Sequence, residues 1–334
     1  MAEQKIIEAI SNLKEDKIKE ILLYKGKEQE FLFEAARKIR EKSKFQNKVE
    51  LRSVIELSNI CSQKCRYCSI SKDGKPSFVL SKEVVLNNVD FLAKKGRRTF
   101  LLQSGENSNQ KFVDDVAYCC SEITKKYPDS KIILCLGNLS YEQYRLLKES
   151  GASRYILKFE TSDSKHHKFC RPSDTIENRL KHIETLLELG FQVGSGNIVG
   201  LPEQTLDNLI ADLKLINKLE LSMVSATRFI SSENSEFKNY SNGDIDLTLN
   251  FLAILRILKP NCLIPSTTSL AINKNQGQIN GLMAGCNTIT IHDGTPEEFE
   301  KNYAIYSQNR FSPNEQYCRE IIEQCKLEAS NYLI

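Results

Sequence analysis

Strand-like runs alternate with helical patterns along most of the chain, and this alternation limits the fold more than any other feature. Between the runs, apolar residues recur at helical spacing; Leu206, Leu209 and Leu213 share one face of residues 205–218. Strands separated by helices form a parallel sheet. Eight such runs predict an α/β protein with a (β/α)8 barrel of the TIM type, and an open doubly wound sheet is the alternative. The expected strands are residues 51–57, 99–103, 131–136, 154–159, 191–199, 223–230, 262–267 and 287–291.

Helical patterns also occupy the start of the chain. Ile6, Ile10 and Leu13 recur at helical spacing, and residues 31–39 form a second amphipathic stretch. No internal repeat or Pro-rich linker marks a domain boundary. We therefore expect an N-terminal helical extension over residues 1–48 and one barrel with a C-terminal helix over residues 49–334. The expected barrel helices include residues 81–95, 177–189, 205–218, 244–258 and 313–329.

Composition excludes several classes of protein. The 334 residues carry 46 Lys and Arg against 43 Asp and Glu, so the net charge of +3 offers no basic field for nucleic acid. No run of 18 apolar residues predicts a membrane span, and the N-terminus lacks the apolar region of a secretory signal. We expect a cytoplasmic protein. In that reducing compartment, 11 cysteines favour metal ligation over a disulfide framework.

Three cysteines stand close together directly after the first expected strand. Cys61, Cys65 and Cys68 have the spacing C-x3-C-x2-C. A structural zinc site normally closes with four protein ligands, but the nearest histidine in the sequence is His166. Three thiolates can instead hold a 4Fe-4S cluster and leave one iron open to a small molecule. A structural or interaction protein that binds zinc remains an alternative of a different class.

The cysteine motif has Tyr67 before its third cysteine, and two further motifs follow later expected strands. Ser104, Gly105 and Glu106 match a "GGE" motif with its first glycine replaced, and residues 196–203 match "GxIxGxxE". With these motifs the chain resembles the radical S-adenosylmethionine (SAM) superfamily. The resemblance implies that the three cysteines hold a 4Fe-4S cluster and that SAM binds its open iron. Reductive cleavage of SAM would then give a 5′-deoxyadenosyl radical that removes a hydrogen atom from the substrate.

The same resemblance implies which side chains bind SAM. A carboxylate can accept hydrogen bonds from the ribose hydroxyls, as expected for Glu160, and a guanidinium can pair with the SAM carboxylate, as expected for Arg179. No catalytic residue is assigned beyond this set. The expected SAM-binding residues are Tyr67, Gly105, Glu106, Glu160, Arg179 and Ile198.

Within the superfamily the chain resembles the biotin synthase-like branch, and the HydE family of FeFe-hydrogenase maturases most of all. The likeness to HydE implies a role in assembling the hydrogenase H-cluster, a small-molecule or metallo-complex substrate, and an electron donor such as a ferredoxin or flavodoxin. Sulfur insertion of the lipoyl type and rearrangement of the methylornithine type are alternative reactions. The segments that carry the likeness are residues 51–59, 102–106, 160–161, 171–172, 177–179, 194–196, 199–202, 204–205 and 264–268.

Some positions depart from these relatives. Leu101, Ile133 and Gly194 stand where biotin synthase binds a second cluster, and none of them can bind iron. Lys158 replaces an arginine and cannot form the same forked contact. Of the C-terminal cysteines only two remain, so we expect no second cluster there.

The roles of several polar residues stay open. Arg228 follows the sixth expected strand, where it can bind an anionic substrate or extend to solvent. His292 follows the last expected strand and can line the barrel mouth. His166 and His167 lie in a polar segment that we expect to be solvated.

Overall fold

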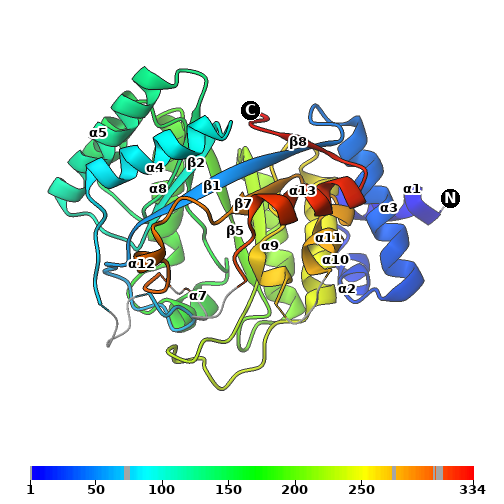
Figure 1. Ribbon diagram of the computed structural model, residues 1–334. Coiled ribbons are helices and arrows are strands. Elements are labelled where there is room, and N and C mark those ends of the chain that lie inside the picture. Colours follow the sequence, from blue (N-terminus) through cyan, green and yellow to red (C-terminus); the bar gives the residue numbers. More distant parts are fainter. Residues whose placement is uncertain (1, 71–75, 273–275, 304, 306–310) are drawn as a thin grey trace.

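The architecture is a parallel sheet that curves into a half-barrel with helices on its outer face (Figure 1). The structure, a computed structural model, describes residues 2–70, 76–272, 276–303, 305 and 311–334. The main path of the sheet runs β6-β5-β4-β3-β2-β1-β7, and β8 pairs with the start of β1. The strands are β1 (Lys48–Ser58), β2 (Thr99–Ser104), β3 (Lys131–Cys135), β4 (Arg154–Ile156), β5 (Gln192–Val199), β6 (Met223–Arg228), β7 (Thr288–Ile291) and β8 (Glu328–Ser330).

The expected α/β barrel architecture is confirmed, but the strand expected at residues 262–267 is wrong. That segment makes only isolated bridges, between Leu263 and Met223 of β6 and between Pro265 and Thr288 of β7. Pro265 has no N–H to donate, which interrupts a regular ladder. Because the segment is bridged on both sides, it links the two edge strands of the half-barrel.

The C-terminal helix is also shorter than expected. It was predicted over residues 313–329, but α13 ends at Gln324, and Lys326 adopts a left-handed backbone with a φ of 55°. A residue in this conformation commonly terminates a helix. The chain then forms β8, and Leu333 and Ile334 pack with Phe45 in the small apolar cluster that also contains Met223.

The other predicted barrel helices begin where their capping residues stand. Ser81, Thr175, Thr205 and Asp244 each accept a backbone N–H of the first turn, as N-cap residues do. The helices are α1 (Ala2–Ser11), α2 (Glu15–Leu22), α3 (Gly26–Lys42), α4 (Lys82–Lys94), α5 (Gln110–Lys126), α6 (Tyr141–Glu149), α7 (Ser164–Cys170), α8 (Ile176–Glu188), α9 (Leu206–Lys218), α10 (Ile245–Leu258), the 3-10 turn η1 (Thr268–Leu270), α11 (Gly277–Met283), α12 (Glu297–Glu300) and α13 (Glu315–Gln324).

The first three helices pack beside α10 at one side of the barrel (Figure 1). A buried ion-pair group closes the N-terminal end of the strands, where Glu50 accepts from Arg52 Nε at 2.8 Å and from Arg154 Nη1 at 2.9 Å. In the described part of the chain, no helix is both long enough and apolar enough to span a membrane.

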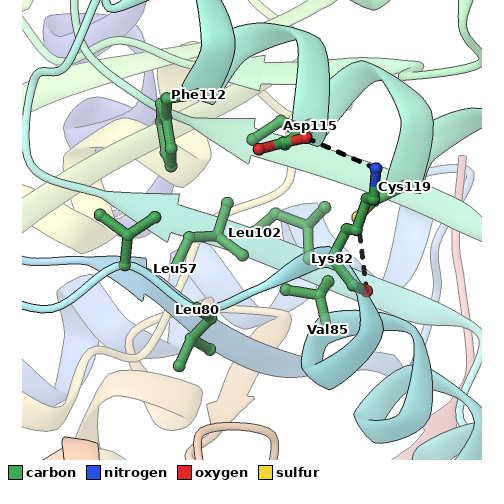
Figure 2. Close-up of a pocket in the computed structure, with 10 residues that line it drawn as sticks. Leu57, Leu80, Lys82, Val85, Leu102, Phe112, Asp115 and Cys119 are labelled. Atoms are coloured by element: carbon green, nitrogen blue, oxygen red, sulfur yellow. Dashed lines mark hydrogen bonds and ion pairs between the residues drawn. The ribbon is translucent and has the colours of Figure 1, made fainter.

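Figure 2 shows a pocket outside the sheet, between α4 and α5. It holds only about 20 Å³ and is lined mainly by apolar side chains such as Leu57, Val85 and Leu102. A space of that size accommodates one water molecule. It is therefore a gap in helix packing, and the site must be sought elsewhere.

Candidate active site

A cavity of about 360 Å³ lies inside the barrel, lined by residues of strands β1 to β7 and of the loops that follow them. Active sites of barrel enzymes form at the carboxyl ends of the strands, and this volume suits a small molecule. Three residues expected to bind SAM line it, namely Tyr67, Glu160 and Ile198. The polar lining also includes Arg52, Gln103, Cys135, Lys158, Ser225, Thr227, Arg228, Thr267, Thr268, Thr290, His292 and Tyr303.

The three cysteines of the C-x3-C-x2-C motif lie in the loop after β1, beside the mouth of this cavity. Cys65 is buried, whereas Cys61 and Cys68 are half-buried. Each sulfur accepts an N–H: Cys61 from the backbone of Glu106 at 3.3 Å, Cys68 from that of Ile70 at 3.4 Å, and Cys65 from Arg171 Nη1 at 3.2 Å. Such donors stabilise negative charge on sulfur and are typical around iron–sulfur clusters.

Burial governs the protonation of these thiols. It raises the pKa of Cys61 and Cys65 and raises the pKa of Cys68 to about 12. Without a metal the thiols therefore stay protonated at neutral pH, and metal binding must release protons.

The described ranges contain no group of three His, Cys, Asp or Glu side chains placed to hold a single metal ion. A 4Fe-4S cluster does not need such convergence, because each thiolate binds a different iron. Three thiols carried by one short loop are a donor set that suits such a cluster.

Gly105 and Glu106, at the end of β2, lie directly against the cysteine loop. A Cβ atom on Gly105 would come within 2.4 Å of the Ile60 carbonyl oxygen and 2.7 Å of Cys61 Cβ. Only glycine allows the strand to approach the loop this closely. Glu106 accepts from Gln63 Nε2 at 2.6 Å and from the Asn138 N–H at 2.9 Å, while burial raises its pKa.

Arg179 enters the same region from the first turn of α8. Its Nη2 lies 3.1 Å from Asp174 Oδ2 and 3.4 Å from Glu106 Oε2, and its side chain is 3% exposed. Asp174 also accepts from Asn138 and Asn178. Burial among these partners fixes the guanidinium beside the cysteine loop.

Arg171 is a site residue that was not predicted as one. Its Nη1 donates to Cys65 Sγ and to the Tyr67 hydroxyl, both at 3.2 Å. It also lies 3.6 Å from Asp174. The available signal was its place before Pro172 in a segment that resembles HydE.

Several buried polar atoms around the cysteine loop have no hydrogen-bond partner within the described residues. Two are amide oxygens, Gln63 Oε1 and Asn138 Oδ1, and two are guanidinium nitrogens, Arg171 Nε and Arg179 Nε. An unpaired buried polar atom costs about 1–3 kcal/mol. Unpaired acceptors and unpaired cationic donors around one loop can receive a ligand that carries both an ammonium and a carboxylate group.

The end of β4 presents Glu160 to the cavity. Lys158 Nζ lies 2.8 Å from Glu160 Oε2 and 3.2 Å from Thr227 Oγ1, so the replacement lysine contacts the carboxylate directly. Ile198 belongs to an apolar cluster with Phe229, and Tyr67 packs against that cluster. These residues give the cavity an apolar wall next to a charged pair.

The expected SAM-binding residues therefore form two neighbouring groups. Tyr67, Glu160 and Ile198 line the cavity. Gly105, Glu106 and Arg179 lie at the cysteine loop. Arg171 touches Cys65 and Tyr67 on one side and Asp174 on the other, so it connects the groups.

Two polar residues whose roles were open line the cavity, and two expected to be solvated do not lie at the surface. Arg228 lines the cavity, but its Nε and Nη1 donate to the carbonyl oxygens of Gly243 and Ile272 at 2.6 and 3.0 Å. His292 lines the cavity, with Nδ1 3.7 Å from Glu56 Oε1. The expectation that His166 and His167 are solvated is wrong, because α7 turns both rings into the interior.

Comparison with known proteins agrees with this geometry. The radical SAM superfamily model matches residues 55–216, from β1 to α9. The chain is 35% identical to the [FeFe] hydrogenase maturase subunit HydE of Thermotoga maritima, over 83% of this chain and 79% of that protein. It is 29% identical to a biotin synthase of Anoxybacillus flavithermus, over 78% of this chain and 80% of that enzyme.

Solved structures share the fold. Methylornithine synthase (PylB) aligns with a TM-score of 0.84 at 20% identity, over 99% of this chain and 97% of that one. The FeFe-hydrogenase maturase HydG from Carboxydothermus hydrogenoformans aligns with a TM-score of 0.79 at 20% identity, over 98% of this chain and 79% of that one. The chain belongs to the radical SAM superfamily of enzymes. Within that superfamily, its sequence falls in the group that contains HydE and biotin synthase.

Proposed function

We propose that this protein is a HydE-like radical SAM enzyme that acts in the assembly of the FeFe-hydrogenase H-cluster. The observation that carries the proposal is the 35% identity to HydE over 83% of the chain. The site is compatible with it, because a thiol-rich loop adjoins a cavity large enough for a small organic or metallo-complex substrate. We further propose a cytoplasmic location and a ferredoxin or flavodoxin as electron donor.

Cys61, Cys65 and Cys68 are the proposed ligands of the 4Fe-4S cluster. The N–H donors on each sulfur support this assignment. Such a cluster would supply the electron for reductive cleavage of bound SAM to a 5′-deoxyadenosyl radical. The chain's own task is to bind and orient SAM, to seat the substrate in the cavity and to exclude water.

The proposed SAM site joins the two groups of residues. Glu106, Arg179 and Gly105 receive the methionyl end, where the unpaired amide oxygens and guanidinium nitrogens can bind its ammonium and carboxylate groups. Glu160 takes the ribose hydroxyls, and Tyr67 and Ile198 pack against the nucleoside. The unpaired buried atoms support this orientation because the ligand would satisfy them.

A reaction that sacrifices a second iron–sulfur cluster is not favoured. Leu101 and Ile133 pack with Val54 in an apolar cluster inside the barrel, at two of the positions where biotin synthase would need ligands. Cys135 lines the cavity nearby, but one thiol cannot hold such a cluster.

The test has two stages. Protein reconstituted without oxygen should bind about four irons per chain, and dithionite with SAM should then release 5′-deoxyadenosine; Cys65→Ala should abolish this release. In the second stage, the enzyme is added to apo-hydrogenase with the remaining maturases, and hydrogen evolution is measured. Release of 5′-deoxyadenosine without hydrogenase maturation would reject the HydE-like role and keep the radical SAM chemistry. One zinc per chain with no iron would reject both.

A further inference from the structure

The backbone of Glu160 has an unusual conformation. Its φ is 68°, and the Thr161 N–H donates to the Phe159 carbonyl at 2.9 Å. This is a γ-turn of the left-handed kind, which is rare for residues other than glycine. Such a conformation is strained and persists only where the surroundings hold it.

Strand β5 holds one side of this turn. The Glu160 N–H donates to the Gly196 carbonyl at 3.0 Å, and the Ile198 N–H donates to the Glu160 carbonyl at 2.9 Å. Glu160 therefore pairs with Asn197 as in a parallel ladder. Gly196 makes room for β5 against β6, since a Cβ there would lie 1.9 Å from the Ser225 carbonyl oxygen.

A single buried carboxylate joins the turn to that strand from the other side. Asp212 lies on α9, outside the sheet, and its side chain is fully buried. Its Oδ1 accepts from the Ser162 N–H at 2.7 Å and from the Ser162 hydroxyl at 2.6 Å, and its Oδ2 accepts from Asn197 Nδ2 at 2.7 Å. In this arrangement all three partners donate, and the two oxygens of a carboxylate accept from all of them without any rearrangement.

A histidine makes a second connection. His166 Nε2 donates to the Pro202 carbonyl at 2.9 Å, because a carbonyl can only accept, and this leaves Nδ1 to accept from the Thr161 hydroxyl at 3.0 Å. The residue after Glu160 is thereby tied to the loop that follows β5.

We propose that Asp212 is a positioning residue for SAM, supported by His166, and that it acts by holding the Glu160 turn so that its carboxylate faces the cavity. The inference rests on the proposed function, in which Glu160 binds the ribose. Asp212 reaches neither the cavity lining nor the cysteine loop, so any effect on SAM must pass through the turn and β5.

The test measures binding of S-adenosylhomocysteine to the reconstituted enzyme by calorimetry. Burial raises the pKa of Asp212 to about 7, against the hydrogen bonds that lower it, so the titrations are run at pH 8. In Asp212→Asn, one acceptor oxygen becomes an amide N–H, so the Ser162 hydroxyl must accept or the Asn197 amide must turn over. Either change alters the contacts that hold the turn, and the Kd should rise at least about three-fold. An unchanged Kd would overturn the proposal.

A matched control separates positioning from loss of stability. Asn250, on α10, is as deeply buried and makes three hydrogen bonds, to the Leu22 and Tyr24 carbonyls and from Gln29. Asn250→Ala should lower the Tm as Asp212→Asn does but leave the Kd within about two-fold. An equal rise in Kd for this control would refute a specific role of Asp212.

A double-mutant cycle tests whether Asp212 affects SAM binding through Glu160. Glu160→Gln should also raise the Kd, and adding Asp212→Asn to it should change the Kd by less than about two-fold, because the two residues act through one contact. Additive effects would contradict the proposal. If Glu160→Gln binds as the parent does, the ribose assignment fails and the inference fails with it. If only Asp212→Asn has no effect, the inference alone fails.

If Asp212→Asn does not fold, Ser162→Ala serves as the second variant. It removes the hydroxyl that donates to Asp212 and leaves the Ser162 backbone N–H in place. We expect its Kd to rise about three-fold, and no change would again overturn the proposal.

Discussion

At the scale of single residues, Arg171 has the most consequential contacts. Its guanidinium donates to a proposed cluster ligand, Cys65, and to a proposed SAM contact, Tyr67, from a fully enclosed position. Both of these bonds come from Nη1, while Nη2 of the same rigid plane lies 3.6 Å from Asp174, and the single nitrogen of a lysine cannot reach all three partners from one fixed plane.

Arg171→Lys should therefore retain iron but lose function. We expect about four irons per chain and a rate of 5′-deoxyadenosine release lowered about ten-fold or more, because hydrogen bonds from a charged donor are lost. The control is Arg145→Lys, in an exposed pair with Glu142 on α6. Equal rates of 5′-deoxyadenosine release for the two variants would show that Arg171 has no role in SAM cleavage.

His167 gives the fold a dependence on pH. Its ring is fully buried with both nitrogens unpaired among the described residues, and burial lowers its pKa to about 4. In the unfolded chain a histidine titrates near its usual pKa of about 6.5, so between these values the unfolded state binds the extra proton. Stability from this residue is therefore complete above about pH 6.5 and is lost as the pH falls towards 4.

The prediction is that His167→Gln flattens the acid limb of the stability curve. Urea unfolding of the parent between pH 7 and pH 4 should include a loss of about 2 to 3 kcal/mol that the variant lacks. Parallel curves for parent and variant would show that the ring is protonated or solvated in the folded protein.

At the scale of elements, α9 supports the site through its start as well as through Asp212. Thr205 Oγ1 accepts from the Asn208 N–H at 3.2 Å, and Asn208 Oδ1 accepts from the Thr205 N–H at 2.8 Å, which forms a capping box. The helix is thereby fixed at the end nearest the loop that follows β5.

Thr205→Ala should destabilise the protein by about 1 kcal/mol, since the first turn loses its side-chain acceptor. Thr205→Ser keeps the oxygen and should leave the free energy of unfolding nearly unchanged. Thermal or urea unfolding measures both, and equal losses would show that the methyl group, not the cap, is what matters.

At the scale of the whole molecule, a group of buried ion pairs joins the N-terminal ends of the barrel strands. Glu50 on β1 pairs with Arg52 and with Arg154 on β4, and it also accepts the Leu333 N–H at 2.9 Å. Strands distant in sequence and the C-terminal segment thus meet at one fully buried carboxylate.

Glu50→Gln should destabilise the fold by about 3–5 kcal/mol, because two buried guanidinium groups lose their counter-charge. Glu142→Gln, which breaks an exposed pair, should cost less than about 1 kcal/mol. Urea unfolding compares them. Similar values would mean that water reaches the Glu50 group in the folded protein.

Local patterns were sufficient for much of this architecture. The strands at 99–103 and 131–136 and the helices capped by Ser81, Thr205 and Asp244 follow from residues adjacent in sequence. The strand expected at 262–267 failed because Pro265 interrupts a ladder whose partners, β6 and β7, come from distant segments. The predicted end of the C-terminal helix was wrong because residues 328–330 pair with β1 as strand β8 instead of extending α13.

By itself the sequence determined the alternation of strands and helices, the cysteine motif and the family, because periodicity and ligand spacing are written in neighbouring residues. The tertiary structure decided that Arg171 reaches Cys65, that His166 and His167 are buried, and that Asp212 clamps the Glu160 turn. Those contacts join side chains from separate elements. Their burial and hydrogen bonding depend on how the barrel curves, which no local pattern encodes.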